Sequence, residues 1–272
     1  KSLFTGNTGQ TFVEKMFLCC LKTELRGKED SEMIFKEQFT MQLKDIGKDN
    51  KIKNRAVLEI LENIACYHSD LVGYGVNNIK ETKVTWILLD WKLKVINRPT
   101  YGQVLTVNTW GKGMNKFFTY RDYEIYDNNN NLCAIATSKW ALIDTEKGKM
   151  SRLTENIINA YKPEKKNVFE EKSLDKVKIP EEFSNTIKYE VIRKDIDINK
   201  HMHNLYYLDL AYEALPDEVY NKRPFDYVRI TYKKEIKLGE KVNCKYVEQD
   251  GKYVIVIKSE DETVIHAIVE LQ

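Results

Sequence analysis

The 272-residue sequence has little proline or glycine, no excess of charge of one sign and no long apolar run. Its 5 prolines and 12 glycines are too few for a disordered or collagen-like chain. With 43 basic and 41 acidic residues the formal net charge is only +2, which argues against a dedicated nucleic-acid-binding protein. No stretch approaches the roughly 20 consecutive apolar residues of a membrane-spanning helix. We therefore expect a globular chain that binds neither nucleic acid nor a membrane.

The 5 cysteines are an odd number, with irregular spacing and no C-x-x-C pair. A structural zinc site is therefore not expected. Cys19 and Cys20 are adjacent, and neighbouring cysteines hardly bridge each other without strain. Because unpaired cysteines are typical of a reducing compartment, the sequence predicts a cytoplasmic protein.

Composition and periodicity divide the chain into four segments. Residues 1–32 differ from the rest and are interpreted as an N-terminal extension or an expression-derived segment. Regular patterning begins at Met33, and residues 33–160 and 183–272 share one layout of a strand, a helix and a series of strands. The charged stretch 161–182 has few large apolar residues, so we expect it to be a linker.

Each half contains one helix with an apolar stripe at helical spacing. The stripe of the first helix is Val57, Ile60, Leu61, Ile64, Ala65 and His68. The second helix is expected over residues 204–215, where Pro216 ends it. Strands are expected at 33–43, 84–96, 104–110, 117–126 and 132–143, and then at 183–191, 227–236, 241–248, 253–258 and 263–271.

This repeated layout predicts an α+β fold made of two tandem hot-dog domains. Each antiparallel sheet would wrap its own long helix, and the two sheets would pair edge to edge. Such a tandem arrangement already supplies the pairing that a single hot-dog domain obtains by dimerising, so we expect a monomer or a homodimer.

The loops of the two halves can be aligned residue by residue. The matched pairs are Asp45 with Asp195, Asn54 with Asn204, and Gly102 with Gly239. At two positions the chemistry differs: Lys51 stands opposite His201, and Arg98 stands opposite Glu235. A lysine cannot replace the proton chemistry of histidine at neutral pH without a large pKa shift. The difference suggests that the second half performs the chemistry and the first half supports it.

The densest polar cluster, residues 195–204, lies immediately before the second helix. Asp197, Asn199 and His201 alternate, so in an extended loop their side chains would point the same way. The first turn of a helix has unpaired backbone N–H groups that can hold an oxyanion. On composition alone, the cluster fits either a catalytic set or an ordinary helix cap.

The spacing D-x-N-x-H-x-x-N-x-x-Y in this cluster resembles the signature of hot-dog thioesterases. Its residues are Asp197, Asn199, His201, Asn204 and Tyr207. The surrounding sequence is similar to the acyl-acyl-carrier-protein thioesterases of plants and bacteria. Residues 99–110, 120–123 and 136–140 resemble further motifs of that family, which occur in the same order. The resemblance covers about residues 33–272.

The resemblance implies hydrolysis of fatty acyl-acyl-carrier-protein thioesters to free fatty acid, without a cofactor or metal. It implies a catalytic set of Asp197, Asn199, His201 and Glu235. We expect Glu235 and His201 to activate water, Asn199 and helix N–H groups to orient the carbonyl, and Asp197 to fix the loop. Many relatives have cysteine where Ile236 stands. Because isoleucine cannot attack a thioester, a cysteine mechanism at that position is excluded.

Two of these features have a simpler interpretation. Lys233, Glu235 and Lys237 alternate, which also fits the solvated face of a strand. His201 and His203 are two residues apart, but no third ligand is evident, so we expect His203 to be a surface residue and not a metal ligand.

The implied substrate makes two further predictions. The acyl chain is expected in the first half, between the helix at 57–68 and the strand that contains Trp86 and Trp91, although both tryptophans also fit an ordinary core. The acidic acyl carrier protein is the expected partner, so a local basic patch should receive it. The candidates are Lys162, Lys165 and Lys166, or Lys200, Lys233 and Lys234.

Three other functions remain compatible with the sequence. An acyl-coenzyme A thioesterase differs only in the thiol carrier that it recognises. A hot-dog enoyl hydratase has Asp and His near an Asn-Pro before its helix, whereas Lys200 follows Asn199 here. A non-catalytic acyl-binding module needs no His and Glu beside an acyl tunnel.

Overall fold

The computed structural model describes residues 34–171 and 174–272, and the predicted extension at 1–32 lies outside them. The first half contains β1 (Phe35–Thr40), η1 (Leu43–Asp45), α2 (Asn54–Leu71), η2 (Val76–Asn78), α3 (Ile79–Thr82), β2 (Val84–Val95), β3 (Val104–Asn115), β4 (Phe118–Tyr126), β5 (Leu132–Asp144), β6 (Lys149–Met150) and α4 (Glu155–Tyr161). The second half contains β7 (Asn185–Glu190), η3 (Arg193–Asp195), α5 (Tyr206–Glu213), α6 (Asp217–Tyr220), β8 (Tyr227–Tyr232), β9 (Lys241–Gln249), β10 (Lys252–Ser259) and β11 (Ile265–Leu271).

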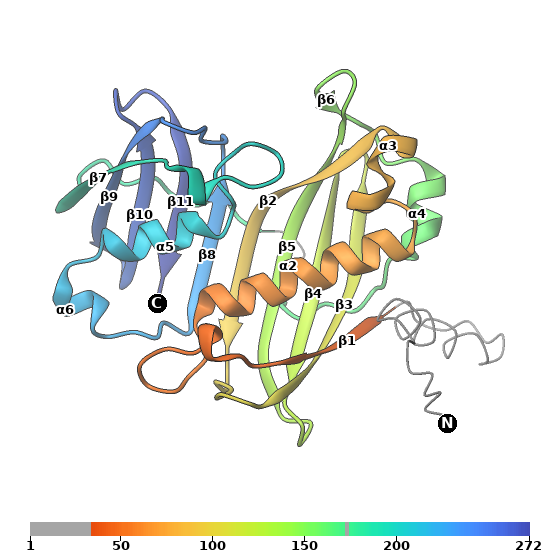
Figure 1. The fold of residues 1–272 in the computed structure, drawn as a ribbon, viewed down its shortest axis with the longest axis horizontal. Helices are drawn as coiled ribbons and strands as arrows, with labels where there is room; N and C mark the ends of the chain where they lie inside the picture. Colours follow the sequence, from red (N-terminus) through yellow and green to blue (C-terminus); the bar gives the residue numbers. More distant parts are fainter. Residues whose placement is uncertain (1–33, 172–173) are drawn as a thin grey trace, which may run out of the picture. The chain divides into compact units, whose positions relative to one another are not determined.

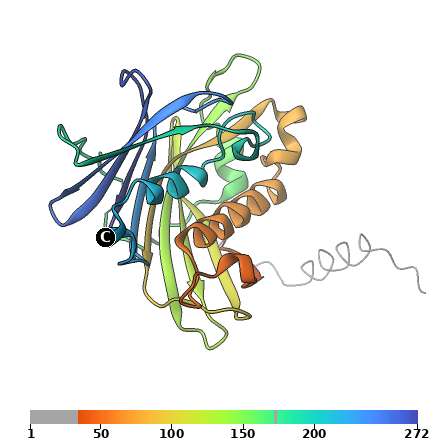
Figure 2. The same ribbon diagram turned by 60° about the vertical axis from the view of Figure 1, so that its left-hand side comes forward.

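These strands form one continuous antiparallel sheet. Its order is β1-β3-β4-β5-β2-β8-β11-β10-β9-β7, with β6 added beside β5. The two halves meet where β2 pairs with β8, from Asp90 opposite Thr231 to Lys94 opposite Tyr227. Helices α2 and α5 lie on the same face of the sheet (Figures 1 and 2). The predicted tandem hot-dog fold, with its edge-to-edge pairing, is confirmed.

The apolar stripe predicted for the first helix is buried along α2. Helix α5 is shorter than the predicted 204–215 and runs from Tyr206 to Glu213. The helix begins later than predicted because the amides of Leu205 and Tyr206 donate to Nδ1 and to the carbonyl oxygen of His203, respectively. Pro216 disfavours helical geometry at the preceding residue, so the helix ends before Leu215.

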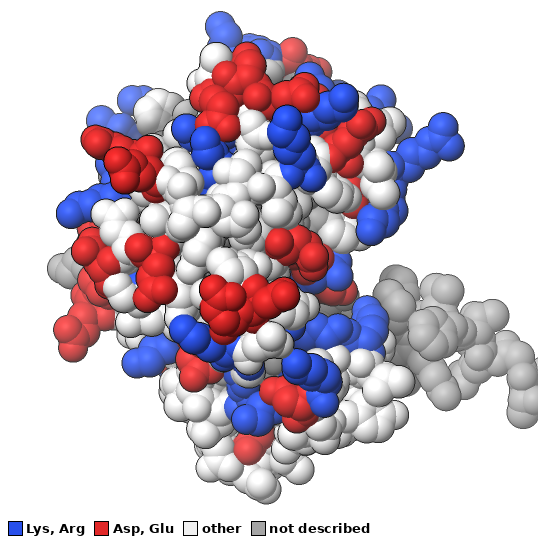
Figure 3. All heavy atoms as spheres, turned by 90° about the vertical axis from the view of Figure 1, so that its left-hand side faces the viewer, with Lys and Arg blue, Asp and Glu red and all other residues white. Residues whose placement is uncertain are grey.

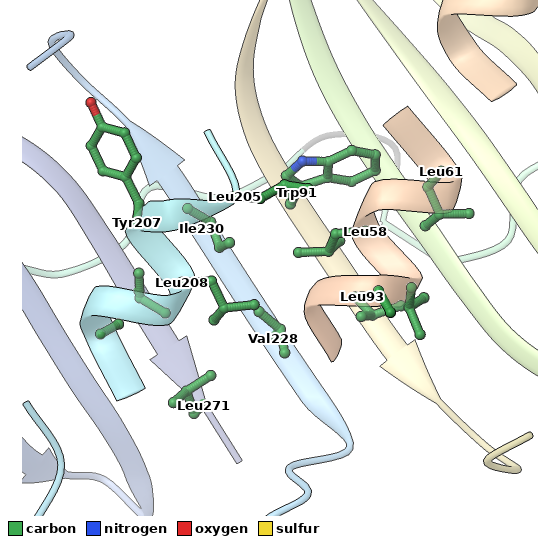
Figure 4. Close-up of a cluster of buried hydrophobic side chains, with 14 of the residues drawn as sticks. Leu58, Leu61, Trp91, Leu93, Leu205, Tyr207, Leu208, Val228, Ile230 and Leu271 are labelled. Atoms are coloured by element: carbon green, nitrogen blue, oxygen red, sulfur yellow. The ribbon is translucent and has the colours of Figure 1, made fainter. Parts of the chain in front are cut away.

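One hydrophobic core runs through both halves (Figure 4). Leu58 of α2 and Leu208 of α5 pack over the sheet, and Trp91 of β2 and Ile230 of β8 lie opposite each other in register. All four side chains have 0% exposure, so the core at the junction is as inaccessible to solvent as the core within each half. Trp91 is therefore a core residue.

Strand β8 is shorter than the predicted 227–236 and ends at Tyr232. The ladder stops because the amides of Lys233 and Lys234 both turn to the carbonyl oxygen of His266, at 2.8 and 3.2 Å. Glu235 lies in the loop beyond. The interpretation of Lys233, Glu235 and Lys237 as one face of a strand is wrong.

The charged segment after α4 crosses the face of the sheet that the helices leave uncovered. Side chains alternate along a strand, so Asp90 and Lys92 of β2 point away from the face to which Trp91 points. On that outer face Asp90 pairs with Arg229, whose Nη2 also donates to the carbonyl oxygen of Asp175 at 3.1 Å. Farther along, the Val168 amide donates to Asp122 at 3.0 Å. The segment therefore binds buried charges of both halves.

Among the described residues, no helix is long and apolar enough to cross a membrane.

We predict that the buried pair Arg229–Asp90 at the junction is important for stability. The two side chains are 5% and 12% exposed, so Arg229→Met would leave an uncompensated carboxylate. The free energy of unfolding should fall by about 3 to 5 kcal/mol in urea denaturation. Lys92→Met is the matched control, because Lys92 stands opposite Arg229 but pairs with the more exposed Glu171, and it should cost less than about 1 kcal/mol. Equal losses for the two variants would contradict the prediction.

Candidate active site

The loop that contains Asp197, Asn199 and His201 is a closed turn. The Asp197 amide donates to the His201 carbonyl oxygen at 2.9 Å, and the Lys200 amide donates to the Asp197 carbonyl oxygen at 3.0 Å. Lys200 takes a left-handed conformation, with φ 66°. The extended loop expected from the alternating residues is wrong, because the chain reverses direction between Asp197 and His201.

The first half contains the same turn. The Gly47 amide donates to the Lys51 carbonyl oxygen at 2.8 Å, and the Asn50 amide donates to Gly47 at 3.1 Å. Asn50 has φ 57°, matching Lys200. Lys51 thus occupies the place of His201, and the alignment of the halves over this loop is confirmed.

The Asp197 carboxylate organises its own turn. Its Oδ1 accepts the Asn199 amide at 2.8 Å and the His201 amide at 3.4 Å. The side-chain amide of Asn199 lies 3.4 Å from Asp197 Oδ2, and a hydrogen bond of that length is weak. Asn199 is exposed, so its Nδ2 can turn toward another acceptor.

Glu235 reaches the same place from the loop after β8. The next carbonyl, of Ile236, accepts the amide of Met202 at 2.8 Å, and His201 forms a β-bridge with Lys237. The backbones of Glu235 and His201 are therefore close. The Glu235 side chain is exposed, and within the described residues it forms no hydrogen bond to Asp197, Asn199 or His201.

The loop that holds Glu235 is supported by His266, for which the sequence suggested no partner. This histidine is 4% exposed in β11. Its Nδ1 lies 3.2 Å from the carbonyl oxygens of both Lys234 and Glu235, so the tautomer with a proton on Nδ1 donates to them.

At the position equivalent to Glu235, Arg98 of the first half has a structural role. The carbonyl oxygen of Pro99 accepts the Ile52 amide at 2.9 Å, as that of Ile236 accepts Met202. The Arg98 guanidinium is 6% exposed and is bonded entirely within the protein. Its acceptors are Ile52 O, Asn54 Oδ1, Phe225 O and Asp226 Oδ1.

A polar pocket of about 350 Å³ lies between α2 and the second half. Its polar lining includes Glu59, Glu62 and Cys66 from α2, and Lys194, Asp197 and His203 from the second half. His203 is half-buried here, so the prediction of a surface histidine is wrong. The sequence analysis missed Glu62, although aligning Asn54 with Asn204 also aligns Glu62 with Tyr212.

Glu62 is in an unusual electrostatic environment. Burial raises its pKa above the ordinary value, His203 and a hydrogen bond from Asn204 oppose the shift, and Asp197 adds to it. The His203 ring is oriented by the Leu205 amide, which donates to Nδ1 at 3.2 Å. An accepting Nδ1 leaves the proton of the neutral ring on Nε2, which is then a donor.

A small apolar cavity of about 70 Å³ lies inside the first half. It is lined mainly by Ala65, Cys66, Trp86, Met114, Trp140 and Tyr161. Trp86 donates from Nε1 to the Tyr161 hydroxyl at 3.0 Å. Cys66 lines both this cavity and the polar pocket, so α2 forms a wall common to the two spaces.

Buried polar groups border the apolar cavity. Arg121, which lines it, places Nη1 2.9 Å from Nδ1 of His68. Burial, and then the charge of Arg121, lowers the pKa of His68 to about 3. His68 is therefore neutral at physiological pH. It is 1% exposed, which confirms the prediction of a core or pocket-lining residue.

The described cysteines are free thiols, buried at Cys133 and Cys244 and half-buried at Cys66. Burial raises the pKa of Cys66 and that of Cys133 to about 11, and it raises the pKa of Cys244 as well. Since the thiolate is the nucleophile, none of the three is activated at neutral pH. Within the described ranges, no group of three or more His, Cys, Asp and Glu residues could hold a metal ion.

The fold and this loop define the class of the protein: a double hot-dog protein with a polar turn before the helix of its second half. Residues 32–161 match the model of the acyl-ACP thioesterase N-terminal domain, and residues 178–271 match that of the C-terminal domain. The chain belongs to the acyl-acyl-carrier-protein thioesterase family.

Plant thioesterases are among the relatives of the chain, at low sequence identity. The chain is 20% identical over 225 residues to oleoyl-acyl carrier protein thioesterase 1, chloroplastic, of Arabidopsis thaliana, which covers 77% of this chain and 62% of that protein. It is 23% identical over 215 residues to the chloroplastic palmitoyl-acyl carrier protein thioesterase of Cuphea hookeriana. That match covers 75% of this chain and 52% of the relative. The chain thus spans about half to three-fifths of these relatives' length, and its own cytoplasmic location stays a prediction.

Solved structures show the same fold. An acyl-ACP thioesterase from Bacteroides thetaiotaomicron superposes with a TM-score of 0.78 at 20% identity, covering 88% of this chain and 97% of that one. The 12:0-ACP thioesterase from Umbellularia californica superposes with a TM-score of 0.76 at 16% identity, and the match covers 90% of this chain and 98% of that one.

We predict that His266 holds the Glu235 loop in place. His266→Phe keeps a planar ring but removes the donor to two carbonyls, and an unmet buried hydrogen bond costs about 1 to 3 kcal/mol. Hydrogen exchange at the amides of Lys233, Lys234 and Met202 should accelerate about tenfold or more, since 1.4 kcal/mol is a factor of ten. The amides that join β9 to β10 serve as an internal control. Unchanged exchange in the loop would contradict the prediction.

Proposed function

We propose that this protein hydrolyses fatty acyl-acyl-carrier-protein thioesters and releases free fatty acid. The observation that supports this most directly is the arrangement of the two spaces. Cys66 lines both an apolar cavity and a polar pocket, and Asp197 of the signature loop lines the polar pocket. An acyl chain in the cavity would bring its thioester to the loop. Membership of the family favours the same activity.

In this proposal the first half, taken as residues 33–160, binds the acyl chain. The second half, residues 183–272, supplies the loop chemistry, and 161–182 link them. Trp86 and Met114 line the cavity, and the unbranched side chain of Met114 can change rotamer to admit a longer chain.

The proposed catalytic set is Asp197, Asn199, His201 and Glu235. Asp197 holds the turn through the amides of Asn199 and His201. Asn199 has an exposed side-chain amide that can bind the thioester carbonyl and its developing oxyanion. Glu235 and His201 take a proton from the attacking water. The helix N–H donors expected from the sequence are not included, because the Leu205 and Tyr206 amides already bond to His203.

A cysteine nucleophile is not part of the mechanism. Ile236 occupies the position where many relatives have cysteine, and it is fully buried. Cys66 is the thiol nearest the proposed path of the substrate, and its pKa of about 11 keeps it protonated. Water is therefore the nucleophile that we propose.

The direct test is a release assay on a ladder of acyl-acyl-carrier-protein thioesters, with matched coenzyme A thioesters alongside. Wild-type protein should release fatty acid from the carrier-protein series. His201→Ala and Glu235→Gln should lower kcat by roughly 10²- to 10⁴-fold, the contribution typical of general acid–base groups. Lys51→Ala, at the equivalent position of the first half, is the matched control and should retain wild-type turnover.

Each outcome of this assay selects one function. Release from coenzyme A alone would make the protein an acyl-coenzyme A thioesterase. Hydration of an enoyl thioester without release would make it a hydratase. Binding without either reaction would leave an acyl-binding module. Wild-type turnover by a folded Glu235→Gln variant would remove Glu235 from the catalytic set.

The carrier protein would dock beside the loop, on four lysines: Lys200, Lys233, Lys234 and Lys237. All four are exposed, and no ion pair engages them among the residues that the structure describes. The alternative patch is less available, because Lys166 pairs with Glu124 at 2.7 Å and lies over the Trp110 ring. On the face shown in Figure 3, basic and acidic side chains are interspersed, so docking depends on a local patch.

We predict that the double substitution Lys233→Glu, Lys234→Glu weakens use of the carrier protein. Because carrier proteins are acidic, kcat/KM for acyl-carrier protein should fall about tenfold or more at low salt, as expected when electrostatic attraction is reversed. The values for the matched coenzyme A thioester should change much less. Lys165→Glu, Lys166→Glu is the comparison pair, and a larger effect there would move the docking site to that patch.

A further inference from the structure

Glu62 lies on the wall of the polar pocket opposite the signature loop. It projects from the middle of α2, and Asp197 and His203 of the second half line the same pocket. The Asn204 side chain interacts with its carboxyl group. A carboxyl group of the first half is thus held next to the loop of the second half.

The equivalent contact on the other side of the junction is structural. There Asn54 donates from Nδ2 to the Tyr212 hydroxyl at 3.0 Å and to the Phe225 carbonyl oxygen at 2.8 Å. Tyr212 stacks on the Phe225 ring and lines none of the pockets described above. The Asn54 contact has a phenol that packs against the core, whereas the Asn204 contact has a carboxyl group that lines a pocket.

The position of Glu62 fits the leaving group of the proposed reaction, and the inference therefore rests on the proposed function. A thioester whose acyl chain lies beyond Cys66 would reach the Asp197 loop through the polar pocket. Its sulfur would then leave through that pocket. Glu235, in contrast, is exposed and does not line that pocket.

We propose that Glu62 is a catalytic residue that donates a proton to the departing thiol sulfur. Water attacks the carbonyl carbon as Glu235 and His201 accept its proton. The tetrahedral oxyanion then collapses, the electron pair of the C–S bond passes to sulfur, and the proton of Glu62 moves to the same sulfur. Fatty acid and free thiol result, Glu62 recovers a proton from solvent, and Glu235 with His201 returns one.

The surroundings of Glu62 support the role of an acid. Burial raises its pKa, which keeps the proton on the carboxyl group at higher pH than in an exposed glutamate. Reaction rates limited by this proton transfer should fall as the pH rises through that pKa, because the donor is then ionised. The other titratable or charged groups that line the pocket or act on Glu62 are Arg55, Glu59, Cys66, Lys194, Asp197, His203, Tyr206 and Tyr232.

The test varies the leaving group at a fixed acyl chain. The two substrates are S-acyl pantetheine and the S-acyl ester of 4-nitrothiophenol, whose thiolate leaves without a proton. Glu62→Gln should lower kcat on the pantetheine ester by about 100-fold or more, within the range of a general acid. On the nitrothiophenyl ester it should stay within a few-fold of wild type.

Two further variants make the result decisive. Glu62→Asp keeps the carboxyl group but shortens the side chain, so it should show a smaller loss confined to the pantetheine ester, and it serves if Glu62→Gln does not fold. Glu213→Gln, an exposed glutamate on α5, should be unaffected on both esters.

If Glu62→Gln lowered kcat equally on both esters, Glu62 would have a positioning role and the proposal would be overturned. An unchanged kcat on both esters would overturn it as well. Failure of the proposed function would look different, because wild-type protein itself would release no acid from any thioester. If Glu235→Gln were active while Glu62→Gln showed the leaving-group effect, the role of Glu235 alone would be lost.

Discussion

The pairing of β2 with β8 is the interaction on which the rest of the molecule depends. It joins two half-sheets in one register and places α2 and α5 side by side on the same face. Residues of one helix then reach the other half: Asn54 meets Tyr212, and Asn204 meets Glu62. A site that needs groups from both halves can form only because these two strands pair and join the half-sheets.

The two halves keep one scaffold and differ in a few side chains. Both have the same closed turn, but Lys51 stands in one and His201 in the other. Arg98 uses all its hydrogen bonds to brace the junction, whereas Glu235 at the equivalent place is exposed. The first half can therefore use these positions for stability, while the second half keeps there the unpaired polar groups that the proposed chemistry requires.

Local patterns in the sequence predicted most of the fold. The stripe along α2 and the repeated order of elements depend on burial at regular spacing, which a sequence displays directly. The end of β8 did not follow from its pattern, because a tertiary contact, the His266 carbonyl oxygen, terminates the ladder. The turn at Asp197 depends on a left-handed Lys200, a residue type with no strong preference for that conformation.

The candidate site was predictable only where it is local. Asp197, Asn199 and His201 lie within five positions and form a motif. Glu62 is far away in the sequence and reaches the loop only through the helix arrangement, so its neighbours alone identify it as an ordinary polar residue of an amphipathic helix. His203 changes from surface to pocket for the same reason, since α2 covers it.

The central claim is that the acyl chain binds in the first half while its thioester lies against the loop of the second. A crystal structure with a non-hydrolysable S-alkyl pantetheine tests it most directly. We predict an alkyl tail beside Trp86 and Tyr161, with the sulfur in the polar pocket between Glu62 and Asp197. A tail bound within the second half, or a sulfur outside that pocket, would contradict the claim.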